Sequence, residues 1–406
     1  MKSKSTWSRR GFLTAVAGTG SAMILDPWSA WAIGQPDPRV ARIVATTIGV
    51  DTHNHIDVPT AVPEVPGPAI DLAGEMKRSG LSAICATFAV DYQKLNNPGE
   101  HYYRFISALD SMDQQLKNNG IKRSLDLADI REANKKHRPA IVQSVEGGHF
   151  LEGRIERVQE AYGRGLRVLG LLHDSDAVVP LGDVYTNPPN YGGLTDFGSR
   201  VIGECNRLGI LIDLTHCSTD TVAAALKRST RPVVFSHTGL DTQLGQDANM
   251  ARMMRPRLIS AAEAKTIADA GGVIGVWTHL SDSPLEYAQH IRAMVDAAGI
   301  DHVCIGTDTK LTPAYRSPGS GGPGGPGGQS GRPGGTGGQG GPGGQGGPGG
   351  GPRIGERTNQ AWKDQQTGFY YAVVDAMLKT GFTADEIGKV GGSNFCRVFD
   401  AATAGH

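Results

Sequence analysis

The sequence of 406 residues has no excess charge of either sign, because 40 lysine and arginine residues balance 40 aspartate and glutamate residues. Nucleic acids and anionic membranes attract basic proteins, so this balance gives no reason to expect either of them as a partner. No segment after the N-terminal region approaches the ~20 consecutive apolar residues that span a bilayer. The length suits one large α/β domain or two ordinary ones.

Cysteine is scarce and irregularly spaced, with five residues at positions 85, 205, 217, 304 and 396. No pair forms a CxxC motif, and an odd number fits no complete disulfide framework. Cys85 and Cys304 lie inside apolar runs, which predicts buried free thiols. Cys217 follows His216 and is a minor candidate for a soft metal ligand.

Residues 1–32 have the features of an export signal. A basic start with the paired arginines Arg9 and Arg10 precedes a mildly apolar stretch rich in Gly and Ala, and SAWA at residues 29–32 offers an A-x-A cleavage site. This combination indicates twin-arginine export, so we expect the twin-arginine export machinery as a partner and a periplasmic or otherwise exported protein. A disordered basic tail and an ordinary secretory signal are the alternatives.

Between residues 33 and 406, short apolar or β-branched runs alternate with amphipathic stretches typical of helices. Eight such units in about 260 residues predict a parallel sheet covered by helices, closed into a (β/α)8 TIM-type barrel. An open doubly wound sheet is the alternative, although no GxGxxG phosphate loop follows the first run. The eight runs are TTIGVDTHNH, SAICATFAV, AIVQSVEGG, RVLGLLHDS, ILIDLTHCS, PVVFSHTG, GGVIGVWTH and HVCIGTDT.

Candidate site residues lie at the C-terminal ends of six of these eight runs, namely the first, third, fourth, fifth, sixth and eighth. The carboxyl ends of barrel strands meet at one mouth, where barrel enzymes hold their active sites. A single histidine at a strand end is usually a satisfied hydrogen-bonding residue, but seven such side chains at equivalent positions predict a shared site. They are His53, His55, Glu146, His173, His216, His237 and Asp308.

These residue types point to a hydrolytic site with two metal ions. Imidazole and carboxylate groups bind Zn²⁺ or a similar ion at about 2.0–2.2 Å. His53 and His55 alternate along a strand and so share a face, on which both can reach one ion. Glu146 can bridge two ions ~3.5–4 Å apart, a spacing that suits a shared hydroxide, and His216 and His237 would complete the second ion.

Two further side chains have predicted roles in the chemistry. A metal lowers the pKa of bound water to about 7, which supplies a nucleophile near neutral pH. Asp308 is then left as the carrier of the proton between that water and the leaving amine. His173 is expected to polarise the substrate carbonyl and to stabilise the developing oxyanion.

The chain resembles the membrane (renal) dipeptidase family, within the amidohydrolase-type metal-dependent hydrolases. The stretches VDTHNH, SVEGGHFLEG, LGLLHDSD, GGLTDFGSRVIGECNRLGILIDLTHCS, PVVFSHTG and HVCIGTD match in the family's order across most of residues 48–400. VEGGH and the GGLTDFG block are specific to the family, whereas HNH alone would not be. The roles that the resemblance implies are the first zinc for His53, bridging for Glu146, the second zinc for His216 and His237, carbonyl binding for His173 and proton transfer for Asp308.

The resemblance also implies an arginine that pairs with the free carboxylate of the substrate. Arg257, which opens the stretch RLIS, falls at that position, and Arg255 is the alternative two residues away. A bidentate arginine–carboxylate pair would select substrates whose second residue is C-terminal, since only that residue offers a carboxylate.

The sequence departs from the family at two places in the expected site. The family has His-x-Asp at the first strand, where this chain has His53 and His55, so the site loses one negative charge. After the eighth strand the family's GxDFDG is replaced by GTDTKLTP, residues 306–313. Both changes bear more on the substrate than on the metal chemistry.

Residues 317–352 are almost entirely Gly, Pro, Gln and Ser. Glycine at every third position formally satisfies the collagen repeat, but most other positions are glycine too and few are proline. We therefore expect a disordered low-complexity loop that interrupts the domain on its active-site face, before a last helix expected at residues 360–381. We expect this segment to be a solvated spacer, and a lid over the mouth of the barrel is the alternative.

The sequence thus favours a dinuclear-zinc dipeptidase that hydrolyses small dipeptides, with a D-residue permitted at the C-terminal position, by means of a metal-bound hydroxide. Other divalent ions remain candidates for the same site. One alternative keeps two Zn²⁺ ions and acts on another small amide or lactone. A second alternative is a metal-binding barrel without catalysis. The sequence leaves the oligomeric state open, with a homodimer among the alternatives.

Overall fold

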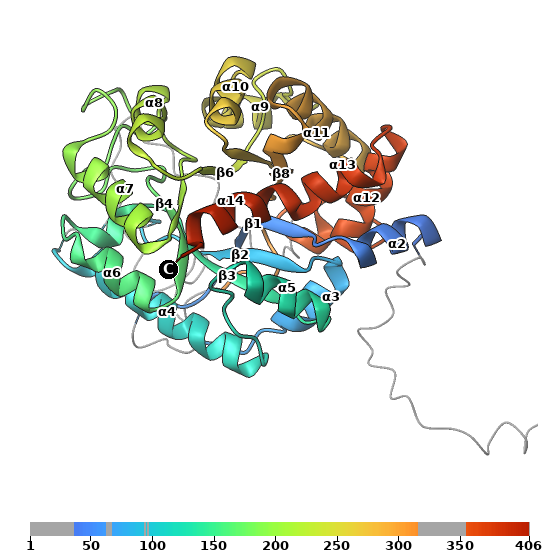
Figure 1. The fold of residues 1–406 in the computed structure, drawn as a ribbon, viewed down its shortest axis with the longest axis horizontal. Coiled ribbons are helices and arrows are strands. Elements are labelled where there is room, and N and C mark those ends of the chain that lie inside the picture. The colour runs from blue at the N-terminus through green and yellow to red at the C-terminus, as the bar shows by residue number, and fades with distance from the viewer. Residues whose placement is uncertain (1–35, 62–66, 93–94, 96, 316–354, 406) are drawn as a thin grey trace, which may run out of the picture. The chain divides into compact units, whose positions relative to one another are not determined.

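Each of the eight apolar runs forms a strand in the computed structural model, which describes residues 36–61, 67–92, 95, 97–315 and 355–405 (Figure 1). Strands β2 to β8 follow one another around the sheet, and β1 pairs with both β8 and β2, so the sheet closes on itself. All pairings are parallel, which confirms the predicted barrel and excludes the open doubly wound sheet. The strands are β1 Val50–His55, β2 Ala83–Thr87, β3 Ala140–Val145, β4 Leu166–Gly170, β5 Leu211–Asp213, β6 Val234–Thr238, β7 Val273–Val276 and β8 Val303–Ile305.

The predicted signal peptide, residues 1–32, and the predicted Gly-rich loop, residues 317–352, lie outside the described residues. Both therefore stay predictions. Within the described part of the chain, no helix combines the length and the apolar character that crossing a bilayer would require.

Helices follow the strands and surround the barrel (Figure 1). Several begin at side chains that satisfy free backbone N–H groups: Thr195 Oγ1 accepts from Gly198 N at 3.0 Å, and Ser260 forms a reciprocal capping box with Glu263. Gly209 ends α7 with a φ of 81°, a left-handed conformation that glycine adopts at little cost. The helices are α2 Pro38–Thr46, α3 Leu72–Ser79, α4 Glu100–Asn118, α5 Leu127–Lys135, α6 Glu156–Gly163, α7 Asp196–Leu208, α8 Thr219–Arg228, α9 Ala248–Met254, α10 Ala261–Asp269, α11 Pro284–Ala298, α12 Phe369–Lys379, α13 Ala384–Gly388 and α14 Asn394–Thr403.

The stretch expected to form the final helix, residues 360–381, is helical only in α12. The Gln365 side chain accepts from Ala361 N at 3.0 Å and donates to the Thr367 carbonyl at 3.1 Å, so this segment is held by side-chain hydrogen bonds. Gly368 then occupies the N-cap of α12. Two further helices, α13 and α14, follow it along the chain.

A ninth strand of two residues, β9 Thr309–Lys310, extends the sheet beside β1 and was not predicted. Asn54 Oδ1 accepts from Leu311 N at 2.8 Å, which holds the segment against β1. Lys310 N donates to the carbonyl of Glu356 at 2.9 Å on its other side. Because these partners are far apart in the sequence, no local pattern marks this strand.

The floor of the barrel is closed by α14, which packs against β5, β7 and β8. Phe395 and Phe399 of this helix join an apolar cluster with residues from the strands, including Val50, Cys85 and Cys304. All five cysteines are buried and free, which confirms the prediction for Cys85 and Cys304. The mouth at the carboxyl ends of the strands therefore lies opposite a sealed floor.

The interior between floor and mouth leaves almost no space. Thr52 Oγ1 donates to the carbonyls of Ser236 at 2.6 Å and Ile305 at 2.9 Å, and so ties β1 to β6 and β8. A Cβ atom at Gly275 would lie 2.0 Å from the Ser236 carbonyl oxygen, and one at Gly306 would lie 1.7 Å from it. Glycine is required at both positions for the strands to approach each other at the level just below the site.

Candidate metal centre

The seven predicted site residues all lie at the mouth, but not all of them belong to strands. His53 and His55 are in β1, His237 is in β6, and Glu146 follows β3 directly. Their positions follow from strand alternation, and the Asn54 side chain between the two β1 histidines contacts Asp51 instead of the site, as predicted.

The other three predicted residues lie three positions beyond their strands, where the chain turns into the mouth. They are His173 after β4, His216 after β5 and Asp308 after β8. His216 has a φ of 69° and Asp308 a φ of 55°, in the left-handed region that side chains other than glycine rarely adopt. Such strain concentrates at functional sites, where the surrounding structure maintains it.

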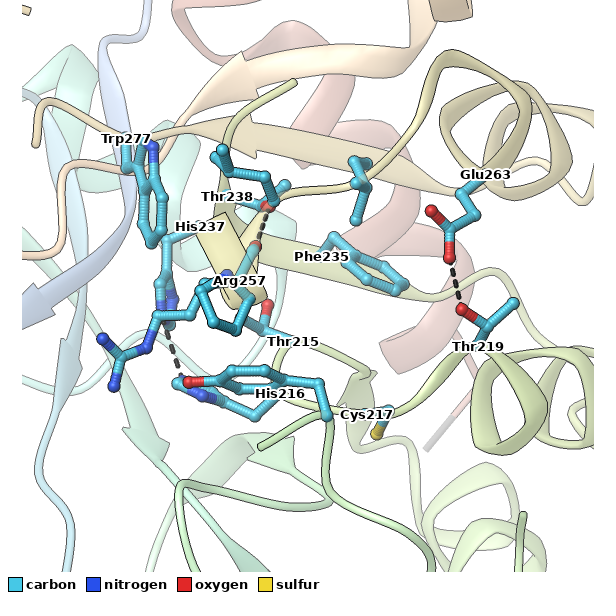
Figure 2. Close-up of a pocket in the computed structure, with 14 residues that line it drawn as sticks. Thr215, His216, Cys217, Thr219, Phe235, His237, Thr238, Arg257, Glu263 and Trp277 are labelled. Atoms are coloured by element: carbon cyan, nitrogen blue, oxygen red, sulfur yellow. Dashed lines mark hydrogen bonds between the residues drawn. The ribbon is translucent and has the colours of Figure 1, made fainter. Parts of the chain in front are cut away.

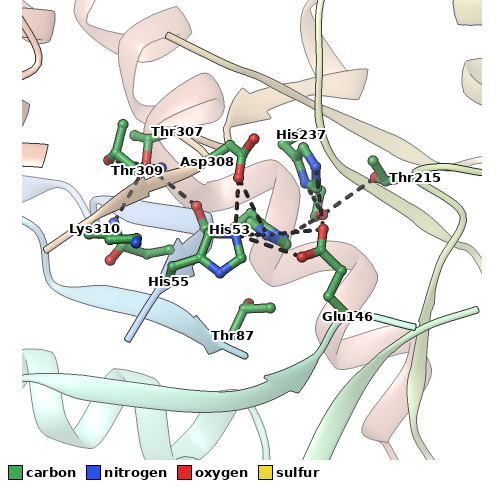
Figure 3. A network of polar contacts seen from close by, with 12 residues as sticks. His53, His55, Thr87, Glu146, Thr215, His237, Thr307, Asp308, Thr309 and Lys310 are labelled. Atoms are coloured by element: carbon green, nitrogen blue, oxygen red, sulfur yellow. Dashed lines mark hydrogen bonds and ion pairs between the residues drawn. The ribbon is translucent and has the colours of Figure 1, made fainter. Parts of the chain in front are cut away.

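Glu146 is the centre of the cluster (Figure 3). Its Oε1 lies 2.8 Å from His216 Nε2, 3.5 Å from His53 Nε2 and 3.6 Å from His237 Nε2. Its Oε2 lies 3.3 Å from His173 Nε2 and 3.7 Å from His55 Nε2. One carboxylate thus faces five imidazoles, which is the arrangement expected of a ligand that bridges two ions.

The donor atoms fit divalent metal ions. The buried Glu146 Oε2 has no hydrogen-bond partner, so an acceptor atom is left for a cation. Imidazole nitrogen with carboxylate oxygen is a donor set that suits zinc. Three groups of side chains offer atoms within 4.8 Å of one another: His53, Glu146 and His237; His53, His55 and Asp308; Glu146, His173 and His216.

The electrostatics of the cluster favour positive charge. Burial raises the pKa of Glu146, but the neighbouring His173, His53 and His216 outweigh this effect and hold the pKa well below its usual range. Burial lowers the pKa of His216, yet hydrogen bonds to Asp174 and Glu146 raise it to about 10. The carboxylates thus favour positive charge on an imidazole such as that of His216, and a bound cation would supply that charge in its place.

A serine that sequence analysis missed orients two of the imidazoles. Ser236 Oγ lies 3.0 Å from Nδ1 of His53 and 3.0 Å from Nδ1 of His237, so both rings direct Nε2 toward Glu146. Ser236 N and Thr215 Oγ1 in turn donate to Asp213 Oδ1, at 3.0 and 2.7 Å. Partners of this kind fix the tautomer and orientation of histidine ligands.

Three acidic or basic side chains beside the site were also missed. Asp91 Oδ1 lies 2.7 Å from His173 Nδ1, Asp174 Oδ1 lies 3.1 Å from His216 Nδ1, and His279 Nε2 lies 2.8 Å from Asp308 Oδ2. Two of them had a local signal. Asp174 directly follows a predicted site residue, and His279 ends the seventh apolar run.

A pocket opens beside the cluster and is lined by His216, His237 and Arg257 (Figure 2). The Arg257 guanidinium forms an ion pair with Asp174 and is mostly buried, whereas Arg255 is exposed to solvent. Of the two arginines, Arg257 therefore reaches the site. Cys217 lines the same pocket but is in none of the candidate ion groups among the described residues.

A (β/α)8 barrel that carries a buried carboxylate among imidazoles at its mouth defines a class of protein, the metal-dependent hydrolases. The chain belongs to the membrane dipeptidase family (peptidase family M19), whose family model matches residues 38–315. It is therefore a metal-dependent hydrolase of the dipeptidase type, as the sequence predicted.

Solved structures share the fold over nearly their whole length. An amidohydrolase from Pseudomonas aeruginosa superposes with a TM-score of 0.65 at 20% identity, covering 90% of this chain and 99% of that one. The probable dipeptidase PvdM from Pseudomonas aeruginosa gives 0.66 at 16%, covering 90% and 98%. A metallopeptidase from Rhodobacter sphaeroides, liganded with a phosphinate mimic of the dipeptide L-Ala-D-Ala, gives 0.59 at 16%, covering 87% and 99%.

Proposed function

We propose that the protein is a dinuclear-zinc dipeptidase that accepts small dipeptides, including those with a D-residue at the C-terminal position. The observation that carries this proposal is Glu146, whose two oxygens face imidazoles on opposite sides while Oε2 has no hydrogen-bond partner. The dipeptide mimic bound by the Rhodobacter sphaeroides metallopeptidase supports the same substrate class.

Two sets of side chains would hold the ions. His53, His55 and Glu146 form the first set, and Glu146, His216 and His237 form the second. When bound, zinc supplies a Lewis acid for the carbonyl and lowers the pKa of water to about 7. Ser236 holds the two rings of His53 and His237 in place during the reaction.

His173 is positioned to donate a hydrogen bond to the substrate carbonyl. Burial lowers its pKa, but Glu146 and Asp91 raise the pKa above its ordinary value, which favours the doubly protonated ring. Asp91 accepts from Nδ1, which leaves the Nε2 proton for the oxygen on which negative charge develops.

Asp308 is positioned to move the proton. Its Oδ1 lies 3.1 Å from His55 Nε2 and its Oδ2 lies 2.8 Å from His279 Nε2. In this orientation the carboxylate takes a proton from the attacking water and passes it to the leaving amine. Arg257, at the edge of the pocket, binds the C-terminal carboxylate of the substrate.

The test is metal content by mass spectrometry, paired with hydrolysis of a panel of L,L and L,D dipeptides. We expect about two zinc ions per chain and turnover of both stereochemical series. His216→Ala should lose one ion and the activity. His302→Ala is the control, because the His302 ring makes a hydrogen bond to Gly272 O outside the site. Absence of stoichiometric metal in the wild type would refute the proposal.

Hydrolysis of another small amide or lactone is the second candidate. It is favoured by His55, which occupies a position where the family has an acid, and by the Arg257–Asp174 pair, which already neutralises the arginine. Two bound ions without turnover of any dipeptide would move the assignment to this activity. Two ions without turnover of any amide, lactone or ester would leave a metal-binding barrel.

We also propose that residues 1–32 direct export through the twin-arginine machinery, which places the enzyme in the periplasm or outside the cell. The paired arginines and the SAWA site support this proposal. Replacing Arg9 and Arg10 by lysine together should retain the protein in the cytoplasm. The experiment compares cell fractions, and continued export of that variant through the general secretory route would contradict it.

A further inference from the structure

Asp174 connects two parts of the site that the proposed function treats separately. It lies in the loop between β4 and α7, one residue after His173. Its Oδ1 is 3.1 Å from Nδ1 of the ligand His216, and its Oδ2 pairs with Nη2 of Arg257. Asp174 thus contacts both a histidine of the metal cluster and the arginine of the pocket.

A third contact fixes the direction of this carboxylate. Tyr185 Oη donates to Asp174 Oδ1 at 2.6 Å, and Tyr185 N donates to the His216 carbonyl at 3.1 Å. The centroid of the Tyr185 ring lies 5.6 Å from the centroid of the His216 ring and 5.8 Å from Arg257 Cζ. Tyr185 therefore holds Asp174 at a position from which both of its other partners are in reach.

The contacts of Asp174 have one consequence for the metal ligand His216 and one for Arg257. On the metal side, a carboxylate that accepts from Nδ1 holds a proton on that nitrogen, directs Nε2 toward the ion and makes Nε2 a stronger donor. On the substrate side, Asp174 engages Nη2 and so fixes the plane of the Arg257 guanidinium, which presents its other N–H groups to the pocket.

We propose that Asp174 is a positioning residue that holds two side chains at a fixed separation. They are His216, for the second ion, and Arg257, for the substrate carboxylate. The inference rests on the proposed function, because it takes Arg257 as the carboxylate anchor. It makes the distance between the second ion and the anchored C-terminus a property of one side chain. The preference for a free C-terminal carboxylate over a C-terminal amide therefore depends on Asp174.

The test uses the full chain with Asp174→Asn, which keeps the shape and removes the charge. Zinc affinity is measured by competition with a chelator, and binding of a phosphinate dipeptide mimic and of its C-terminal amide is measured by calorimetry. We expect the affinity for the second zinc to fall about 10–100-fold. The preference for the carboxylate over the amide should fall as well, in the same variant.

Asp176→Asn is the matched control, since Asp176 is an exposed acid of the same loop that accepts a hydrogen bond from Asn187 Nδ2 at 3.3 Å. It should change neither the zinc affinity nor the preference for the carboxylate over the amide. In an Arg257→Ala background, Asp174→Asn should still weaken zinc binding but have no further effect on the carboxylate preference. Asp174→Glu keeps the negative charge on a longer side chain. Compared with Asp174→Asn, it should restore the zinc affinity more than the preference for the carboxylate.

The outcomes separate this inference from the proposed function. If the wild type prefers the carboxylate and Asp174→Asn leaves both quantities unchanged, the inference is overturned and the dipeptidase stands. If the wild type shows no preference, the proposed function and the Arg257 half of the inference fail together. Unchanged zinc affinity in Asp174→Asn overturns the His216 half in either case. A thermal unfolding curve for each variant confirms that the comparison is between folded proteins.

Discussion

Ser236 shows how one small side chain supports the metal cluster. It is the shared hydrogen-bond partner of His53 and His237, at 3.0 Å from each ring, and it is 1% exposed. Ser236→Ala leaves two buried ring N–H groups without that acceptor, so we expect a loss of about 1–3 kcal/mol in stability and about 10–100-fold in metal affinity. Thermal unfolding and zinc competition with a chelator measure the two effects.

Ser111→Ala is the control for that prediction. Ser111 is also fully buried and donates one hydrogen bond, to the carbonyl of Pro59 at 3.0 Å, on a helix outside the site. Its removal should lower stability without changing zinc affinity. Equal zinc affinity in Ser236→Ala and the wild type would show that the two histidines need no common partner.

At the residue scale, the sequence identified the side chains that form the candidate metal cluster and missed those behind them. His53, Glu146 and His216 could be predicted because strand ends of a barrel converge and these residue types bind metals. Ser236 and Asp91 could not, because hydroxyls and carboxylates occur widely at strand ends and loops. Their roles depend on partners from other strands, and only the folded chain brings those partners together.

At the scale of elements, the approach of β6, β7 and β8 depends on glycine. A Cβ at residue 306 would lie 1.7 Å from the Ser236 carbonyl oxygen, with the Thr52 hydroxyl 2.7 Å away. Gly306→Ala would force the backbone at residue 306 away from the Ser236 carbonyl, so we expect a destabilisation above about 4 kcal/mol. Urea unfolding measures it. Gly163→Ala, where a Cβ would meet no atom within 4 Å, should instead be neutral or stabilising.

The loop between β4 and α7 depends on a buried carboxylate. Asp183 is 2% exposed and accepts from the backbone N–H groups of Asn190, Tyr191 and Gly193 at 2.6, 2.9 and 2.6 Å. Burial raises the pKa of Asp183, but these three hydrogen bonds outweigh it and lower the pKa below its usual value. The carboxylate therefore contributes stability above the unfolded pKa of about 3.9, and this contribution is lost as the pH falls through the folded pKa.

Asp183→Asn should consequently cost about 2 kcal/mol near pH 7, because a neutral amide replaces a charged acceptor of three N–H groups. The difference from the wild type should shrink as the pH falls below about 4. Denaturant unfolding at a series of pH values measures it. Asp269→Asn, on an exposed helix face beside Lys265, should change stability by less than about 1 kcal/mol at any pH. A constant difference across the series would contradict the prediction.

Strands were the most predictable elements and short tertiary segments the least. Each long apolar run became a strand because both faces of a barrel sheet are buried. β9 has two residues and exists only through Asn54 and Glu356, so its sequence carries no pattern of its own. The segment before α12 was predicted to be helical. Its backbone instead forms hydrogen bonds with the Gln365 side chain, from Ala361 N and to Thr367 O.

At the scale of the whole molecule, the two sides of the Gly-rich segment are tied together without it. Lys310 N donates to Glu356 O at 2.9 Å, and Arg357 Nη2 donates to Leu311 O at 2.9 Å. Deleting residues 319–351 should therefore leave fold, metal content and dipeptide turnover unchanged. A shorter connection between fixed ends changes stability by only about 1 kcal/mol.

Unfolding curves, metal analysis and steady-state kinetics test the deletion. Replacing residues 319–351 with a Gly-Ser segment of equal length is the control, since it separates length from composition. If the deletion lowers turnover while metal content and stability hold, the segment acts at the mouth as a lid. Recovery by the Gly-Ser replacement would then assign that action to length alone.

The position of α14 has a consequence for biosynthesis. Phe395 and Phe399 cover the lower ends of strands made much earlier in translation, β1 among them. A nascent chain that has not yet released this helix from the ribosome holds eight apolar strand ends open to water. The barrel can therefore reach its native stability only after α14 has left the ribosome exit tunnel. Until then, chaperones have an exposed ring of apolar side chains to bind.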